Sequence, residues 1–242
     1  MKKKSRRIRK YIFGPRAELS EKANHFITLL IRVFLVIAGC GALLQGRLQL
    51  LFITLLTFFI TFLPKIIEKR YKIDIPVELE IVSILFIFAA LFLGEVQHFY
   101  VRLWWWDILL HSLSGITLGF VGFLILYVLD RGGRIDTSPF LIAVFSFCFA
   151  VAIGSVWEIF EFGMDQIFGL NMQKSGLVDT MWDLIVDSLG ALIASFTGYF
   201  YMRKKGGVFD KFMKRFERDN PTLFREIKKL KKKIEIEDGR KN

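Results

Sequence analysis

Residues 139–163, PFLIAVFSFCFAVAIGSVWEIFEFG, decide the fold class of this chain. The stretch contains no Lys or Arg, and its charged residues are Glu158 and Glu161 near its end. A bilayer core about 30 Å thick is crossed by roughly twenty apolar residues of an α-helix that rises about 1.5 Å per residue. The stretch is therefore predicted to be a transmembrane helix.

Five other stretches have a similar apolar character and nearly the same length. They lie at 25–44, 48–64, 76–94, 105–129 and 180–202. The second is the weakest, because three residues separate it from the first and Pro64 is expected to close it. Together these two stretches predict a transmembrane hairpin. The predicted fold class is all-α: a polytopic membrane protein with six transmembrane helices.

Basic residues are segregated from the apolar stretches. The chain is 53% hydrophobic, yet its formal net charge is +11. If the N-terminus is cytoplasmic, thirty of the 34 Lys and Arg lie on the cytoplasmic side, as the positive-inside rule favours. Arg47, Arg102 and Lys174 lie in outer segments, and Arg32 within the first helix is expected to be paired or to reach an interface. The sequence thus predicts a multi-pass protein of the cell (plasma or inner) membrane with both termini cytoplasmic.

Composition divides the chain into three predicted domains. They are a basic cytoplasmic N-terminus at 1–24, a six-helix transmembrane domain at 25–202, and a basic amphipathic cytoplasmic tail at 203–242. In the tail, apolar residues alternate with Lys and Arg at helical spacing. The apolar residues are Phe209, Phe212, Met213 and Phe216. We expect this helix to lie along the inner membrane surface, with membrane lipids as its partners and no nucleic acid.

Ionisable residues cluster in the last three predicted helices, although each costs about 2.5 to 3.5 kcal/mol near the centre of an inserted helix. They are Asp107 and His111, then Glu158, Glu161 and Asp165, then Asp179, Asp183 and Asp187. Spacings of three and four residues place each set on one face of its helix. Because the three helices alternate in direction, all three sets fall in the outer half of the membrane. The sequence predicts that they form one site.

Simpler structural roles are available for part of this set. Asp107 and Asp179 lie near helix starts, where a carboxylate caps free backbone N–H groups as readily as it binds a ligand. Asp165 is expected to be solvated at a helix end. Several glycines are expected to let the helices approach closely. These are Gly115, Gly119, Gly122, Gly190 and Gly198.

The chemistry of the cluster follows from its charge. Carboxylates that face each other in a low dielectric repel, so they must share protons, pair with cations or bind a metal. The predicted metal ligands are Asp107, His111, Glu161 and Asp183, and the predicted catalytic residues are Glu158 and Asp187. Oxygen ligands with one imidazole suit a divalent Mg, Mn, Zn or Fe ion. Such an ion would polarise a phosphoryl oxygen and activate water, which makes a lipid-linked or cell-envelope substrate the expected class.

Two other functions use the same residues. A cation- or proton-coupled transporter also relies on carboxylates and a His within the membrane, and a polar path from Asp187 to the cytoplasm would favour it. A structural protein would use the cluster only to hold its helices together. A sealed inner half favours an enzyme.

The spacings Asp107-x3-His111, Glu158-x2-Glu161 and Asp183-x3-Asp187-x2-Gly190 resemble those of YjdF-type bacterial inner-membrane proteins, over about residues 25–202. The last three helices also resemble, more distantly, the VanZ-like family linked to glycopeptide (teicoplanin) resistance. In that family an Asp and a His share one helix, Glu-x2-Gln follows, and Asp-x3-Asn-x2-Gly closes the set. This chain has Glu161 in place of that Gln and Asp187 in place of that Asn, and the extra negative charge favours a cation. The resemblance implies where the site lies and names no reaction.

Overall fold

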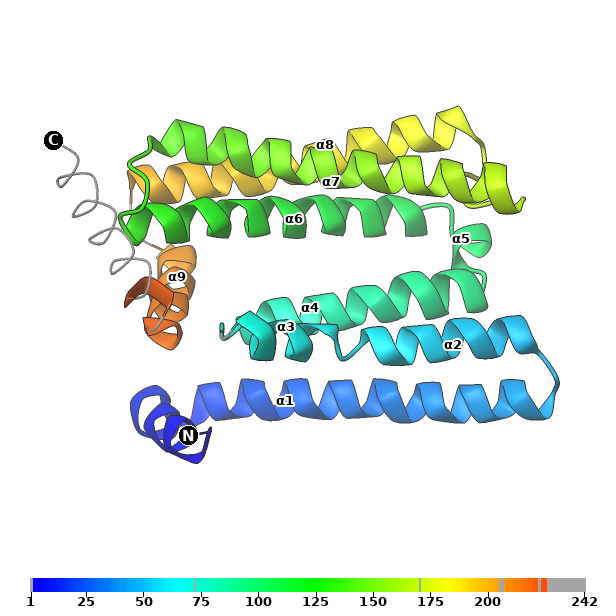
Figure 1. Cartoon of the computed structure of the whole chain (residues 1–242), viewed down its shortest axis with the longest axis horizontal. Coiled ribbons are helices and arrows are strands. Elements are labelled where there is room, and N and C mark those ends of the chain that lie inside the picture. Colours follow the sequence, from blue (N-terminus) through cyan, green and yellow to red (C-terminus); the bar gives the residue numbers. More distant parts are fainter. Residues whose placement is uncertain (1, 72, 170, 205–206, 222, 226–242) are drawn as a thin grey trace, which may run out of the picture. The chain divides into compact units, whose positions relative to one another are not determined.

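A computed structural model describes residues 2–71, 73–169, 171–204, 207–221 and 223–225, with side chains from residue 22 onward except at 49, 207 and 208. All regular secondary structure in these ranges is helical (Figure 1), which confirms the predicted all-α class. Most side chains of the predicted segment 1–24, and residues 226–242 of the predicted tail, lie outside the described part of the chain.

Five helical segments of the described chain are long and apolar enough to cross a membrane. They are Lys22–Leu44, Leu50–Tyr71, Val77–Val96, Trp106–Arg131 and Pro139–Phe168. The sixth predicted span, 180–202, forms the single helix α8 (Leu177–Arg203). This helix carries three Asp in its first three turns and is not among the five. The protein is thus a multi-helix membrane protein with five candidate spans among its described residues, and the predicted sixth span is not confirmed.

The chain folds as two compact units, Met1–Arg102 and Leu103–Asn242. The helices of the first unit are α1 (Lys2–Leu44), α2 (Leu48–Ile60), α3 (Leu63–Tyr71), α4 (Val77–Ile87), the π-helix η1 (Phe88–Val96) and α5 (Phe99–Arg102). α1 and α2 form the predicted hairpin and turn at Gly46, whose φ of 66° favours glycine. Pro64 does not close the second span as predicted, because it lies in the first turn of α3, where a missing N–H has no helical partner.

A fully partnered polar cluster lies inside the first unit. Glu80 is 4% exposed, and its carboxylate accepts a hydrogen bond from Asn24 Nδ2 at 2.7 Å and pairs with Lys65 Nζ at 2.7 Å. Arg32 Nε donates to Thr61 Oγ1 at 3.0 Å, and its Nη2 donates to the Thr61 carbonyl at 2.9 Å. The expectation that Arg32 is paired is confirmed.

The second unit is a bundle of three long helices with one shorter helix at an end (Figure 1). Its helices are α6 (Trp106–Arg131), α7 (Pro139–Phe168), α8 (Leu177–Arg203) and α9 (Gly207–Asp219). α7 begins at a Ser138 cap, whose hydroxyl accepts the Leu141 N–H at 3.2 Å, followed by Pro139. It ends at Gly169, whose φ of 63° permits the left-handed turn. α6 and α8 run in one direction and α7 runs against them (Figure 1).

α9 packs against its own bundle. Met213 is fully buried and Phe216 is 8% exposed, and both belong to a core with Phe123, Tyr127 and Tyr201 of α6 and α8. The apolar face of this tail helix thus packs against protein, and its position along the inner membrane surface stays a prediction. The aromatic ends of α6 and α8 provide the apolar surface that this face covers, and a hydropathy pattern along the chain does not reveal such a partner.

Candidate metal centre

Glycines of α6 and α7 leave room for Asp187 of α8 between these two helices. A Cβ on Gly154 of α7 would lie 2.6 Å from Asp187 Oδ2, and one on Gly115 of α6 would overlap the Asp187 carbonyl. A Cβ on Gly190 would in turn lie 2.6 Å from the Ser112 carbonyl. The close approach predicted for Gly115 and Gly190 is confirmed, and it lets three backbones pack around one carboxylate.

This register brings more polar side chains to a common level. α6 and α8 run parallel and α7 runs against them, so a step of four residues from the Asp187 level moves about 6 Å along all three helices. One such step toward the α7–α8 loop brings His111 of α6, Glu158 of α7 and Asp183 of α8 to the same level. The three sets that the sequence singled out thus meet inside one bundle.

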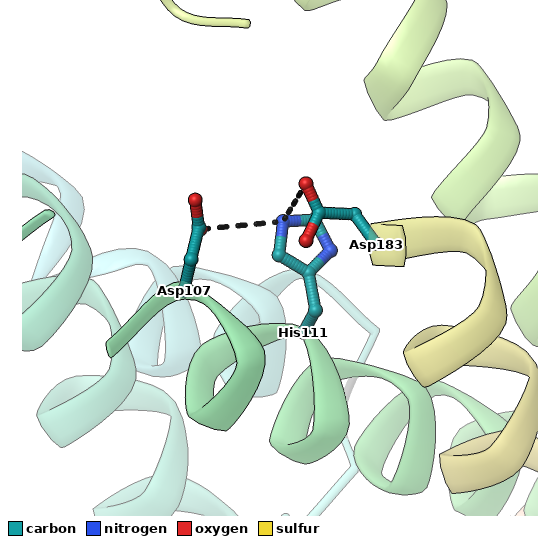
Figure 2. A group of neighbouring side chains, drawn as sticks. All are labelled: Asp107, His111 and Asp183. Atoms are coloured by element: carbon teal, nitrogen blue, oxygen red, sulfur yellow. Dashed lines mark ion pairs between the residues drawn. The ribbon is translucent and has the colours of Figure 1, made fainter. Parts of the chain in front are cut away.

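His111 lies at the centre of the cluster. Its Nε2 is 3.7 Å from Asp107 Oδ1 and 3.9 Å from Asp183 Oδ2. Figure 2 shows that both carboxylates face this one ring nitrogen, Asp107 from α6 and Asp183 from α8. These distances exceed the range of a good hydrogen bond. Two ligands that each lie about 2.1 Å from one ion are separated by up to about 4.2 Å. The spacing therefore fits atoms that share an ion better than atoms bonded to each other.

The same three residues meet the general requirements of a divalent-cation site. Ligand atoms of Asp107, His111 and Asp183 all lie within 4.8 Å of one another. A shift of about half an ångström brings that separation into coordination range. The His111 and Asp183 side chains are 11% and 6% exposed, and Asp107 is 21% exposed, so the site opens on the Asp107 side.

Asp187 holds the other edge of the imidazole. Its Oδ2 lies 3.3 Å from His111 Nδ1, and its Oδ1 accepts a hydrogen bond from the Ser114 hydroxyl at 2.7 Å. A carboxylate on the distal nitrogen fixes the tautomer that leaves Nε2 free to bind a metal. The predicted catalytic residue Asp187 is thus placed to orient the His111 ring.

Glu158 is the least satisfied residue of the site. The residue is 4% exposed, and neither carboxylate oxygen accepts a hydrogen bond of ordinary geometry from the described residues. The Thr180 hydroxyl, which accepts the Gln173 amide at 2.6 Å and keeps its own proton to donate, is the group near enough to influence this carboxylate. Glu158 follows Gly154 by one turn on the buried stripe of α7, so it points toward the same interior. An unpartnered buried carboxylate is costly unless a cation or substrate compensates it.

Two other predicted residues lie beside the centre. Glu161 is not among the three residues with mutually close ligand atoms, and its Oε1 accepts the Trp157 indole N–H at 3.0 Å. Asp165 is not simply solvated, because its carboxylate accepts the backbone N–H groups of Met172 and Gln173 at 2.7 and 2.9 Å. It therefore holds the α7–α8 loop over the site.

Sequence reasoning missed Ser114 and Lys174 as members of the site. Lys174 Nζ pairs with Asp107 Oδ2 at 2.6 Å, and its backbone N–H donates to Asp179 Oδ2 at 3.1 Å. Both residues left a signal. Ser114 follows His111 by three residues, and Lys174 is the one basic residue of its loop. A serine in a membrane helix commonly bonds a backbone carbonyl, and a lysine at a membrane interface is common, so spacing alone did not select either residue.

Comparison with known sequences places the chain in a family. Residues 23–204, which span most of each unit and include every residue of the site, match the family described as "Predicted membrane protein (DUF2238)". The chain belongs to the DUF2238 family. A DUF2238 assignment agrees with the five apolar spans and supports contact with membrane lipids.

A similar protein occurs in Thermotoga maritima, where it is described as "Uncharacterized protein". It is 31% identical to this DUF2238 chain over 148 residues, which is 61% of this chain and 74% of the relative. No solved structure matches the chain.

Proposed function

We propose that this protein is a divalent-metal-dependent membrane enzyme that hydrolyses a phosphate ester on a lipid-linked or cell-envelope substrate. The observation that carries the proposal is His111, with Nδ1 held by Asp187 and Nε2 facing Asp107 and Asp183 at 3.7 and 3.9 Å. The unpartnered carboxylate of Glu158 is an independent sign that the interior awaits a ligand.

The side chains divide the chemistry between them. Asp107, His111 and Asp183 would hold the ion, with Glu161 beside them as a further ligand, and the ion would polarise a phosphoryl oxygen. Glu158 is the natural general base, because a buried carboxylate without donors gains most from taking a proton from water. Asp187 acts through His111 as a positioning residue rather than as the base.

The opposite half of the bundle supports an enzyme over a transporter. Buried side chains between Asp187 and the α9 end are small or apolar, and include Gly119, Ala191, Ala194, Phe123 and Ile142. Ser146 and Ser195 each donate to a helix carbonyl, and the buried hydroxyls of Tyr127 and Tyr201 contact each other at the α9 end, where Tyr127 donates to Glu217. A continuous polar route, which a coupled cation or proton would need, is missing from these described residues.

The orientation that we propose keeps α8 as the sixth span, with both termini cytoplasmic. Charge segregation supports it, and so does the packing of α8 along α6 and α7, since a helix of 27 residues is about 40 Å long. In this orientation the α7–α8 loop faces outward and the site accepts substrate from the outer leaflet. The VanZ-like resemblance adds a cell-envelope substrate class and remains part of this proposal.

Metal analysis of the purified protein tests the centre. We expect about one divalent ion per chain in the wild type and less than a tenth of that in a double variant with His111→Ala and Asp183→Asn. A double variant with His25→Ala and Asp136→Asn is the matched control, since it makes the same chemical changes at exposed positions outside the site. Equal metal content in all three proteins would remove the metal centre.

Hydrolysis needs its own measurement. Wild-type protein is placed in phosphatidylcholine vesicles that contain about 10% phosphatidic acid, which serves as a simple lipid-phosphate substrate. It should release inorganic phosphate only when metal is present. Glu158→Gln should bind metal and release no phosphate. A metal-loaded wild type that moves the ion across sealed vesicles without releasing phosphate would favour the transporter instead.

A further inference from the structure

Lys174 forms an ion pair with Asp107, one of the proposed metal ligands, at the open side of the centre. Its ammonium lies 2.6 Å from Asp107 Oδ2, while the other oxygen of the same carboxylate lies 3.7 Å from His111 Nε2. One carboxylate thus faces the proposed ion with one oxygen and a lysine with the other. Because the Lys174 side chain is 29% exposed and that of Asp107 is 21% exposed, the pair stands at the open side of the site.

The backbone fixes where this lysine stands. The carboxylate of Asp165 in α7 accepts the N–H groups of the two residues that precede Lys174. Asp179 of α8 accepts the backbone N–H of Lys174 at 3.1 Å. The Gln173 amide donates to Thr180 Oγ1 at 2.6 Å. The loop is therefore tied to both helices around residue 174, and only the flexible side chain is left to move.

The charge balance explains why a movable cation is useful. The carboxylates of Asp107, Asp179, Asp183, Asp187, Glu158 and Glu161 lie in or beside the site, and Lys174 supplies the one lysine or arginine in the described contacts with them. A divalent ion adds two positive charges beside this ammonium. Like charges so close repel, so the ion and the ammonium cannot both keep Asp107 as their main partner.

We propose that Lys174 is an exchangeable counter-ion of the centre: a divalent ion displaces its ammonium from Asp107, and the released ammonium then binds the phosphate of the substrate. The inference rests on the proposed metal centre and adds a specificity residue to it. Lysine suits this role, because it presents a compact charge on a flexible stem and binds phosphate as a point charge. The site would therefore select anionic substrates only after the ion has entered.

Metal affinity tests the exchange. Titration of the purified protein with Mn²⁺ and with Zn²⁺ should give a Kd about three- to tenfold lower for Lys174→Gln than for the wild type, since the ion no longer competes with a tethered cation. Lys174→Arg keeps the charge and should bind close to the wild-type value. Lys204→Gln, at an exposed lysine beyond α8, is the matched control and should leave the Kd unchanged.

Release of the ammonium is measured on the wild type alone. Lys174 is acetylated with a water-soluble, amine-reactive acetyl donor, and peptide mass spectrometry follows the rate. The rate at Lys174 should become several times faster when Mn²⁺ is added, whereas the rate at Lys204 should not change. Inorganic phosphate should bind to the Mn²⁺-loaded wild type and at least tenfold more weakly to Mn²⁺-loaded Lys174→Gln.

The outcomes separate the two proposals. If neither wild type nor Lys174→Gln binds Mn²⁺ or Zn²⁺, the metal centre itself fails. If both bind with equal Kd and Lys174 acetylation is unaffected by metal, the centre stands and the exchange is wrong. If metal releases Lys174 but phosphate binds equally to both proteins, the substrate role of Lys174 is wrong.

Discussion

Two polar clusters of this protein differ in how completely their charges are satisfied. In the first unit, Glu80 accepts two partners at 2.7 Å. Arg32 is bound by Thr61 and also lies 3.7 Å from the centre of the Phe62 ring. In the second unit, Glu158 is equally buried and has no hydrogen-bond partner of ordinary geometry among the described residues. The same residue type at the same burial is therefore in two different electrostatic situations.

The difference separates a structural role from a functional one. A buried charge with complete partners holds helices together and has nothing left to bind. Buried carboxylates in excess of their partners cost folding free energy, and a protein keeps them when a ligand repays that cost. Substitutions at matched positions of the two clusters should therefore have opposite effects on stability.

The largest effect is expected at the satisfied cluster. Glu80→Ala removes the acceptor of Asn24 and the partner of Lys65, and should lower the free energy of unfolding by about 3 kcal/mol. Equilibrium unfolding in mixed micelles measures this. Glu78→Ala, at an exposed carboxylate of the same helix, should cost less than about 0.5 kcal/mol. Equal losses in both variants would contradict a structural role for Glu80.

A glycine pair on α7 gives the next effect. Gly154→Ala would place a Cβ 2.6 Å from Asp187 Oδ2 and should cost about 2 kcal/mol of unfolding free energy, together with a weaker metal affinity. Gly163→Ala has open space on the same helix and should raise stability by up to about 1 kcal/mol. If both substitutions stabilise the protein, the close packing around Asp187 is incorrect.

Asp187→Asn tests the positioning role with a readout that packing alone would not change. The variant keeps the shape and the Ser114 contact but weakens the hold on His111 Nδ1, so the Kd for metal should rise about tenfold. Metal titration measures it, beside an unfolding curve taken without metal. Metal affinity at the wild-type level would assign Asp187 to packing only.

The smallest effect is the one of opposite sign. Glu158→Gln removes an uncompensated buried charge, so without metal it should raise the unfolding free energy by about 1 kcal/mol. Glu80→Gln makes the identical change where partners exist and should lower stability. Destabilisation of the metal-free protein by both variants would remove the contrast between the two clusters.

The sequence by itself determined which segments are apolar helices and which of their residues are out of place there. The near absence of charge in 139–163 is enough to make that helix, because a membrane span depends on composition more than on any partner. Spacings of three and four residues also determined which ionisable side chains share a helical face, as with Asp107 and His111.

Only the tertiary structure decided how those faces meet. Gly115 and Gly154 set the register that brings His111 and Asp183 together, and such a register depends on backbone approach between helices rather than on any one helix. The structure likewise turned Glu161 toward Trp157, brought Lys174 to Asp107 and packed α9 against its bundle. The partners in each of these contacts are determined by tertiary packing. The spacing of residues along the sequence carries no information about that packing.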